Sequence, residues 1–254
     1  MAAWRDSAAK TSTARTANNK LKIVRTLFQS AWRDSLLTDN PAAKVPALKS
    51  VESKRRPFTL KELKAILSEA NVEWRGMVLA GFYLGQRLKD IASLTWANVD
   101  LERAEIRFAT SKTGRRQFLH ISRPLLAYIS ELPAADDPKA PLFPLSYPLA
   151  QRPGGTAMLS GQFHNLLVSA GLAKARLPKH KNKGIGRNAA RELGNISFHS
   201  LRHTATSHLK ATGASEAVTR DIIGHESAEI SRHYTHVDED QKRQALDKLP
   251  DITI

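Results

Sequence analysis

The sequence predicts an α+β fold that is mainly α-helical, with one small antiparallel sheet or hairpin. Long stretches of the 254 residues have apolar side chains every three or four positions, which is the period of an amphipathic helix. Two neighbouring segments, 104–112 and 115–122, are instead rich in β-branched and aromatic residues, and they flank the turn-forming pair Thr113-Gly114. A short sheet within a helical domain accounts for both patterns.

One amphipathic helix is expected near the N-terminus, at residues 17–37. Its apolar residues recur at helical spacing, and the pair Asn40-Pro41 ends the pattern. An apolar face must be covered by another element, so this helix cannot close a core alone. The stretch 41–57 mixes proline, small residues and a Lys-Arg-Arg cluster, a composition typical of an extended basic linker.

This linker indicates two domains. We expect a residual N-terminal helix with its linker at 1–49 and a larger domain at 50–254. The larger domain should begin with a helix near Leu60, because Thr59 and Glu62 have the spacing of a capping box. Further helices are expected at about 74–84, 87–94, 160–170, 198–211, 215–223, 227–234 and 238–249.

The charge of the chain favours a polyanion as its partner. Lys and Arg number 39 against 24 Asp and Glu, which gives a net charge of +15 and a pI near 10.2. Small domains are usually designed with a net charge of about 2–8, so this excess points to nucleic acid. The segment 174–191 is the most basic stretch and is expected to be a loop.

Composition also excludes several classes of protein. The absence of cysteine rules out disulfides, thiolate nucleophiles and Cys-based zinc sites. No apolar run reaches the roughly 20 residues of a membrane span, and the first residues lack the apolar region of a signal peptide. We therefore expect a cytoplasmic protein without a membrane partner.

Residues suited to phosphate chemistry lie in the last quarter of the chain. On the helix expected at 198–211, His199 and Arg202 share one face. Arginine presents a planar fork that matches two phosphate oxygens, and histidine can donate or accept at neutral pH. Further on, His225 precedes Tyr234, whose phenol can act as a nucleophile where cations stabilise its anion. Together these residues favour attack on a phosphodiester without a metal.

Three residues nearer the middle of the chain can complete such a site. Arg87 supplies a second guanidinium, and Asp90, one helical turn onward, can orient a neighbouring cation. Lys112 stands at the end of an expected strand, before the turn. A partly desolvated lysine can act as the general acid that a sugar alkoxide needs to leave.

Four strings, taken in order, resemble the tyrosine recombinases of the phage integrase type. They are LGQRLKDIASLTWANVD, TSKTGR, FHSLRHTATSHL and IIGHESAEISRHYTHV, and the resemblance covers about residues 54–240. The ordered combination is specific, although each string alone is weak. Gln86 differs from the residue that many members have before the arginine, and we treat this difference as minor. The N-terminal helix resembles only the last helix of the family's core-binding domain, so the earlier helices are expected to be missing.

The resemblance implies a role for each matching residue. Arg87 and Arg202 would bind the scissile phosphate, with Asp90 in the supporting acidic position. Lys112 would be the hairpin lysine that protonates the leaving 5′-oxygen.

The remaining three matching residues would carry out proton transfer and nucleophilic attack on the phosphate. His199 and His225 would assist proton transfer and phosphate binding, and Tyr234 would be the nucleophile. The implied activity is DNA strand breakage and rejoining through a covalent 3′-phosphotyrosyl intermediate, used in site-specific recombination for integration or excision of a mobile element. No cofactor is implied, because the covalent intermediate conserves the bond energy.

The resemblance also implies partners and a setting. Double-stranded DNA would be the substrate, bound by a homotetramer in the synaptic complex that forms from free monomers. The protein would be bacterial or phage-derived and associated with the nucleoid. The tail after Asp238 is suited to docking on a neighbouring copy. The basic segment is expected to contact the phosphate backbone through Lys181, Lys183, Arg187 and Arg191.

Three alternatives remain open at this point. A relaxing enzyme of the type IB topoisomerase kind uses the same chemistry to rejoin the original strand. A truncated, catalytically impaired integrase would only occupy DNA. A zinc site is the weakest of the three: His199 and His203 have the i, i+4 spacing of a metal pair, but no thiolate or nearby carboxylate completes a ligand set. We therefore predict no metal.

Overall fold

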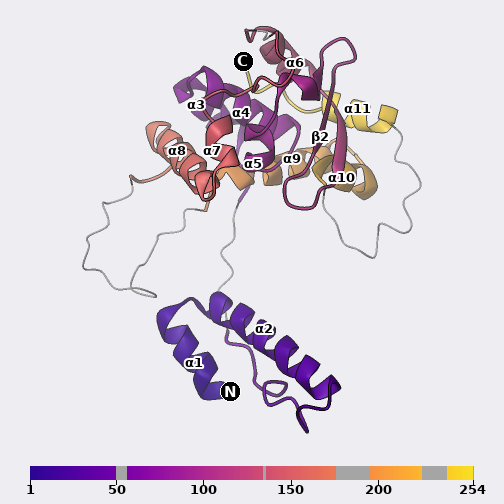
Figure 1. The fold of residues 1–254 in the computed structure, drawn as a ribbon. Coiled ribbons are helices and arrows are strands. Elements are labelled where there is room, and N and C mark those ends of the chain that lie inside the picture. Colours follow the sequence, from indigo (N-terminus) through magenta and orange to yellow (C-terminus); the bar gives the residue numbers. More distant parts are fainter. Residues whose placement is uncertain (50–55, 134–135, 176–194, 225–238, 254) are drawn as a thin grey trace. The chain divides into compact units, whose positions relative to one another are not determined.

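The computed structural model describes residues 1–49, 56–133, 136–175, 195–224 and 239–253 of the chain. They form two compact units (Figure 1). The smaller unit comprises residues 1–49, and the larger unit comprises the other described residues.

The smaller unit is built on two packed helices, α1 (Ala2–Thr11) and α2 (Ala14–Arg33). The side chain of Thr13 caps α2 by accepting a hydrogen bond from the Thr16 amide at 3.2 Å. The expected N-terminal helix is thus present as α2. The sequence does not predict α1, because this helix is rich in alanine and polar residues and buries only Ala9.

The stretch after α2 folds back onto that helix. Leu21 packs with Ala42 and Val45 in a small apolar core. The Asn18 side chain bonds both backbone groups of Leu48, each at 2.8 Å, and the Arg25 guanidinium donates to the backbone carbonyl of Ala42 at 3.1 Å. The first part of the expected extended linker is therefore docked, because side chains of α2 satisfy its backbone groups.

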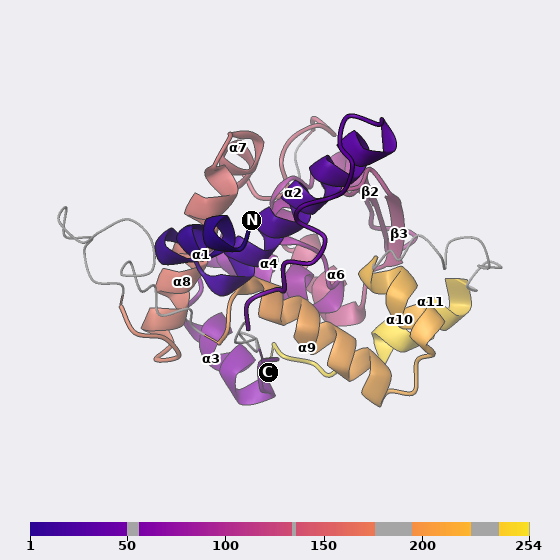
Figure 2. The ribbon, with the colours of Figure 1, turned by 90° about the horizontal axis from the view of Figure 1, so that it is seen from below.

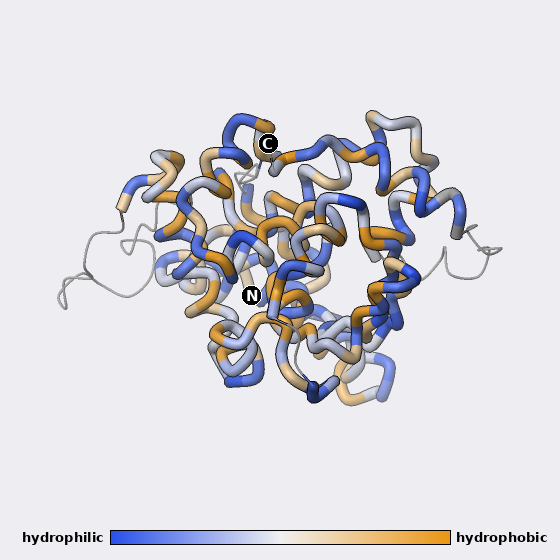
Figure 3. The backbone as a smooth tube through the Cα atoms, turned by 90° about the horizontal axis from the view of Figure 1, so that it is seen from above, coloured by the Kyte–Doolittle hydropathy of each residue, from blue (hydrophilic) through white to orange (hydrophobic). Residues whose placement is uncertain are grey.

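The larger unit is mainly helical, as predicted. The helices among its described residues begin with α3 (Leu60–Glu69), α4 (Val72–Tyr83), α5 (Leu88–Ala92), α6 (Arg123–Ser130), α7 (Tyr147–Gln151), α8 (Gly155–Ser169), α9 (Phe198–Ala211) and α10 (Glu216–Ile223). The last helix is α11 (Glu239–Asp247). Helix α4 is buried along nearly its whole length and packs against α5, α6 and α9. Figure 3 shows blue and orange stretches alternating along much of the chain, as expected where most helices bury one face.

A three-stranded antiparallel sheet lies beside the last two helices. It consists of β1 (Val99–Asp100), β2 (Glu105–Ala109) and β3 (Arg116–His120), in that order, and α11 packs against β3 (Figures 1 and 2). Ile106 pairs with Leu119, and both are buried. The predicted hairpin is confirmed. The short strand β1 is additional, and its pairing with β2 defines it.

The C-terminal segment packs on the core of its own chain. Leu249 and Ile252 are buried there. The Tyr83 hydroxyl of α4 donates to the Pro250 carbonyl at 3.0 Å and accepts from the Ile252 amide at 3.3 Å. Burial raises the pKa of Tyr83 above its ordinary value, so this hydroxyl remains a donor. The tail was expected to suit a neighbouring copy, but its described part is occupied within the chain because its apolar side chains complete the core.

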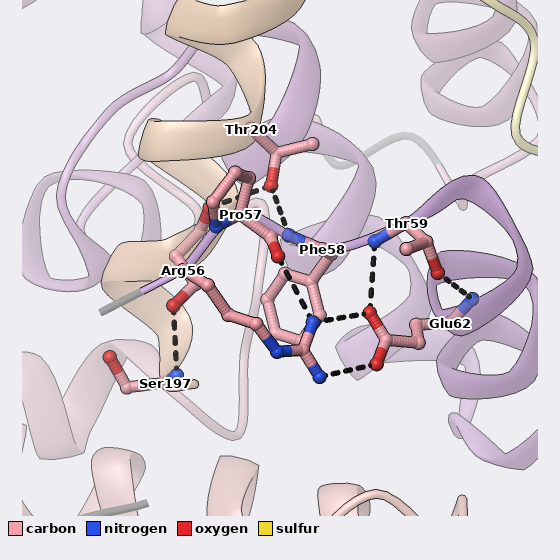
Figure 4. A network of polar contacts seen from close by, with 8 residues as sticks. Arg56, Pro57, Phe58, Thr59, Glu62, Ser197 and Thr204 are labelled. Atoms are coloured by element: carbon pink, nitrogen blue, oxygen red, sulfur yellow. Dashed lines mark hydrogen bonds and ion pairs between the residues drawn. The ribbon is translucent and has the colours of Figure 1, made fainter. Parts of the chain in front are cut away.

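The beginning of the larger unit is anchored to α3 and α9 (Figure 4). The Arg56 amide donates to the Asn195 carbonyl at 3.0 Å, and the Phe58 amide donates to Thr204 Oγ1 of α9 at 2.8 Å. The Arg56 guanidinium donates to both carboxylate oxygens of Glu62, at 2.8 and 2.6 Å. Thr59 and Glu62 form the predicted capping box. The chain is thus fixed where it enters the unit.

This anchor gives the stability a component that depends on pH. The hydrogen bonds from Arg56, helped by the Thr59 amide, lower the pKa of Glu62 to about 2. A carboxylate with a lowered folded pKa stabilises the fold above its unfolded pKa, and this contribution disappears as the pH falls from about 4.5 to about 2. Glu62→Gln should therefore reduce the free energy of unfolding at pH 7 by about 1 kcal/mol, because the pair is partly in water.

Urea unfolding of both proteins at pH 7 and pH 2.5 measures this difference. The gap between parent and variant should shrink at the lower pH. Glu69→Gln, at the other end of α3, is the matched control and should change neither value. An equal gap at both pH values would contradict the role given to Glu62.

Candidate active site

The turn between α4 and α5 brings the two predicted arginines together. Gly85 has a φ of +62°, a conformation that favours glycine, and a Cβ there would lie 2.3 Å from Ile223 Cδ1. Its carbonyl accepts a hydrogen bond from Arg202 Nη1 at 2.9 Å. The turn that presents Arg87 is therefore held directly by the Arg202 side chain of α9.

Arg202 is a buried cation with unused hydrogen-bonding capacity. The residue is only 2% exposed, and its Nε and Nη2 have no hydrogen-bond partner within the described residues. Burial lowers the pKa of Arg202 to about 10, and the nearby positive charge of Arg87 acts in the same direction, against the Asp90 carboxylate. The group still carries its charge at neutral pH. A buried cation with free donors is the arrangement expected where an anion binds.

Asp90 connects the arginines with the hairpin. Its side chain is fully buried, and Oδ1 accepts from the Ser111 amide at 2.7 Å. The other oxygen lies 3.9 Å from Arg87 Nη1, while the Arg87 side chain is 29% exposed. The carboxylate thus partly offsets two neighbouring guanidiniums and fixes the residue next to Lys112.

Lys112 lies in the turn of the hairpin and is exposed. The Thr110 amide donates to the Arg115 carbonyl and the Gly114 amide donates to the Thr110 carbonyl, both at 2.8 Å, so the turn is closed. The hydrogen bond from Ser111 to Asp90 then fixes this turn relative to Arg87. The structure thus connects the backbone beside Lys112, rather than its ammonium group, to Arg87 through Asp90.

His199 lies on α9 three residues before Arg202 and is half-buried. Its ring meets the ring of His203 edge to face, with centroids 4.8 Å apart and planes at 88°. His199 and Arg202 thus lie on α9, Arg87 caps the N-terminus of α5, and Asp90 lies within α5. Within the described residues, no group of three or more His, Asp or Glu side chains is arranged to hold a metal.

The other predicted site residues cannot be located in this way. They are His225, Tyr234, Lys181, Lys183, Arg187 and Arg191, and they lie outside the described residues. The structure does describe Gly224, the residue directly before His225. Helix α10 ends at Gly224, with a φ of +70°, and a Cβ there would lie 2.3 Å from Gln117 Nε2.

Sequence reasoning undervalued one residue, Gln86. It is 2% exposed, and its Nε2 donates to the backbone carbonyls of Leu84 and Ile222, each at 2.8 Å. Only its position, a polar residue directly after an apolar helix and before Arg87, could have drawn attention to it. Burial of an amide requires partners, and the partners of Gln86 Nε2 belong to two separate segments.

Known proteins resemble this chain in sequence and in fold. The family model described as "Phage integrase family" matches residues 56–241, which is most of the chain. The chain belongs to the phage integrase family. The matched region of this integrase-family chain includes Arg87, Asp90, Lys112, His199 and Arg202.

Relatives of this integrase-family chain are bacterial tyrosine recombinases. It is 21% identical over 243 residues to tyrosine recombinase XerC of Alcanivorax borkumensis, which covers 92% of the chain and 72% of the relative. It is 23% identical over 248 residues to tyrosine recombinase XerD of Haemophilus influenzae, covering 94% of the chain and 76% of the relative.

Solved structures share the fold of this integrase-family chain. Lambda integrase (residues 75–356) bound to DNA is similar with a TM-score of 0.60 and 17% identity, over 97% of this chain and 81% of that one. A lambda integrase tetramer bound to a Holliday junction gives 0.58 and 18%, over 92% and 64%. The predicted fold class, mainly helical with a small antiparallel sheet, is confirmed.

The burial of Asp90 leads to a prediction for this integrase-family chain. Asp90→Asn should lower the free energy of unfolding by about 1–3 kcal/mol, because the buried guanidinium of Arg202 loses a compensating negative charge. The neutral amide oxygen is also a weaker acceptor, so hydrogen exchange of the Ser111 amide should become faster.

Exchange measured by NMR and unfolding in urea test this expectation. Asp100→Asn is the control, since Asp100 is 38% exposed and lies 3.8 Å from Arg103 at the surface. If both variants behave alike, Asp90 does not have the supporting role assigned to it.

Proposed function

We propose that this protein is a site-specific DNA recombinase that cuts and rejoins strands through a covalent 3′-phosphotyrosyl intermediate, for integration or excision of a mobile element. The observation that supports this most strongly is the buried Arg202, whose Nε and Nη2 are unpaired within the described residues. Arg87 and Asp90 lie beside it. A phosphodiester oxygen supplies the negative charge that these donors lack.

In the proposed reaction, Tyr234 attacks the scissile phosphorus. A bond forms between the phenol oxygen and phosphorus, the bond from phosphorus to the 5′-oxygen breaks, and the phenol proton passes to a neighbouring base. Lys112 gives a proton to the leaving 5′-oxygen, so a free 5′-hydroxyl results. Attack by a 5′-hydroxyl of another strand reverses these steps and releases Tyr234. No external energy source is needed, since each step exchanges one phosphodiester for another.

The two arginines act on the charge that develops during this transfer. Preorganised cations in a buried site stabilise a phosphorane-like transition state without having to reorient. One well-placed arginine contributes about 10³–10⁵ in rate in other phosphoryl transfers. In this proposal, His199 and His225 donate hydrogen bonds to the phosphate and assist proton transfer, and the carboxylate of Asp90 keeps Arg87 in place.

Double-stranded DNA is the proposed partner, approached by a chain whose net charge is +15. In the proposed setting it is bound to the nucleoid in the cytoplasm, a monomer when free and a tetramer during strand exchange. The printed description of one similar structure is a lambda integrase tetramer on a Holliday junction. The basic side chains Lys181, Lys183, Arg187 and Arg191 are proposed to contact the phosphate backbone. As to membranes, none of the described helices is long and apolar enough to cross one.

A plasmid with two copies of a recognition duplex tests the recombinase activity. The duplex is first selected from a random pool by binding to the protein. Exchange of the segments flanking the two copies is the expected result. Relaxation of supercoiled plasmid without exchanged products would instead indicate a topoisomerase-like enzyme. Binding with neither product would leave a DNA-binding protein and overturn the proposal.

A further inference from the structure

The hairpin turn that carries Lys112 is anchored on both sides. On the first side, the Ser111 amide donates to Asp90 of α5 at 2.7 Å. On the other side, Arg115, which directly precedes β3, donates from Nη2 to Asp221 Oδ1 of α10. The turn is therefore connected to two separate helices, one at each end.

Asp221 is itself held by a second cation. Its other oxygen, Oδ2, lies 3.1 Å from Lys242 Nζ of α11, and Lys242 is only 5% exposed. The side chains of Asp221 and Arg115 are 25% and 29% exposed, so water reaches this pair only in part. Isolated surface ion pairs constrain little, whereas a network of several charges constrains its members more strongly. The carboxylate is thus a fixed point for Arg115.

Helix α10 is fixed in turn to the segments that carry the two arginines. Ile223 is fully buried, and its Cδ1 would lie 2.3 Å from a Cβ on Gly85, so the helix touches the turn before Arg87. The same helix packs against α9, which carries Arg202. The ion pair at the end of the hairpin turn therefore sets the position of that turn relative to both guanidiniums.

The position of this backbone limits what the Lys112 ammonium can reach. Lysine has a flexible four-carbon stem, which by itself does not direct its charge to one atom. A general acid must come within about 2.6–3.2 Å of the oxygen that it protonates. A displaced turn would therefore impair protonation while leaving the arginines, and the phosphate site they form, in place.

We infer that Asp221 is a positioning residue that acts through Arg115 to align the turn of Lys112 for protonation of the leaving 5′-oxygen. This inference rests on the proposed function and adds to it a residue from a third segment of the chain. A carboxylate is repelled by a phosphate, so the contribution of Asp221 to the reaction is indirect.

The test compares single-turnover cleavage of two nicked duplexes of the selected sequence. One is ordinary DNA, and the other has sulfur in place of the 5′-oxygen that leaves. When the bond from phosphorus to sulfur breaks, the electron pair stays on sulfur and a thiolate departs. Since a thiol has a pKa of about 8.5, this leaving group needs no proton from Lys112.

Asp221→Asn should lower the cleavage rate of bound ordinary DNA by about 10–100-fold, because misplacement by about 1 Å can have an effect of this size. On the sulfur duplex the rate should stay within about threefold of the parent. The dissociation constant should be unchanged or lower, since a negative charge is removed. Lys112→Met gives the reference pattern, with a loss of about 10²–10⁴-fold on ordinary DNA alone.

Two further variants separate geometry from charge. Arg115→Met breaks the same ion pair with the opposite change in net charge, and it should give the same dependence on the leaving group. It also replaces Asp221→Asn if that variant does not fold. Glu216→Gln is the matched control, because Glu216 lies on the same helix, is 65% exposed and pairs with Arg220 at 2.5 Å. It should leave both rates unchanged.

The outcomes distinguish this inference from the proposed function. An Asp221→Asn protein that cleaves ordinary DNA within threefold of the parent would overturn the inference, and so would an equal loss on both duplexes, which indicates a general disturbance of the site. If sulfur does not rescue Lys112→Met, the lysine is not the general acid and the inference fails, while strand cleavage itself stands. If the parent forms no covalent adduct with DNA that it binds, the proposed function fails as well.

Discussion

Arg202→Met is expected to abolish DNA cleavage while leaving the protein folded. The rate should fall by about 10³-fold or more, because the variant loses the buried cation proposed to stabilise the charge on the phosphorane. The free energy of unfolding should change by less than about 2 kcal/mol, since the lost hydrogen bond to the Gly85 carbonyl is offset by removal of a cation whose burial is unfavourable.

The sign of the pKa shift supports this separation of activity from stability. The folded pKa of Arg202 lies below its ordinary value because of burial and the nearby Arg87. A base with a lowered folded pKa reduces stability at neutral pH, where both states are protonated, and this penalty diminishes as the pH rises through about 10. Its removal offsets the loss of the hydrogen bond to the Gly85 carbonyl.

Single-turnover cleavage and urea unfolding of the same preparations measure the two quantities. Arg103→Met is the matched control, because its side chain is 69% exposed and its removal subtracts the same charge. It should weaken binding slightly and leave cleavage of bound DNA unchanged. An Arg202→Met protein that cleaves within tenfold of the parent would remove the main support for the proposed phosphate site.

Tyr234→Phe should eliminate the covalent adduct with DNA completely. The variant lacks the oxygen that forms the bond to phosphorus, and no other group of the proposed mechanism replaces it. DNA affinity should stay within about twofold, because the substitution removes one hydroxyl and no phosphate-binding cation. The expected pattern is thus full binding without any protein-linked DNA on a denaturing gel.

Tyr147→Phe provides the control for this substitution. Tyr147 begins α7, far from the site in sequence and outside the proposed mechanism, and its loss should leave the adduct at the level of the parent. An adduct that persists in Tyr234→Phe would show that another residue is the nucleophile, and the assignment carried over from the family pattern would be wrong.

Local patterns in the sequence were sufficient for the elements that position the site. The period of apolar residues predicted α9 with the correct bounds, and the spacing of Thr59 and Glu62 predicted the capping box. Helix α6 was missed, because Pro124 and its short length resemble a turn. Strand β1 has two residues, and only its partner β2 identifies it. Such elements depend on tertiary contacts that no local pattern contains.

The sequence was sufficient to predict which residues form the site, but not how deeply each side chain is buried or what it bonds. Motif order identified Arg87, Asp90 and Arg202, and the structure brings them together. That Arg202 is buried with free donors, and that Gln86 caps α10, follows from packing between segments more than 100 residues apart. Long-range burial of this kind cannot be derived from the spacing of residues along the chain.

In the proposed mechanism, DNA becomes joined to Tyr234 through a 3′-phosphate. The most direct test uses a nicked duplex of the selected sequence, in which the fragment downstream of the cut diffuses away and the adduct accumulates. Protease digestion and mass spectrometry of the adduct then identify the linked residue. We predict a peptide containing Tyr234 that carries a nucleotide through its 3′-phosphate, together with a free 5′-hydroxyl on the released strand. A linkage through a 5′-phosphate or another residue, or no adduct with DNA that the protein binds, would contradict it.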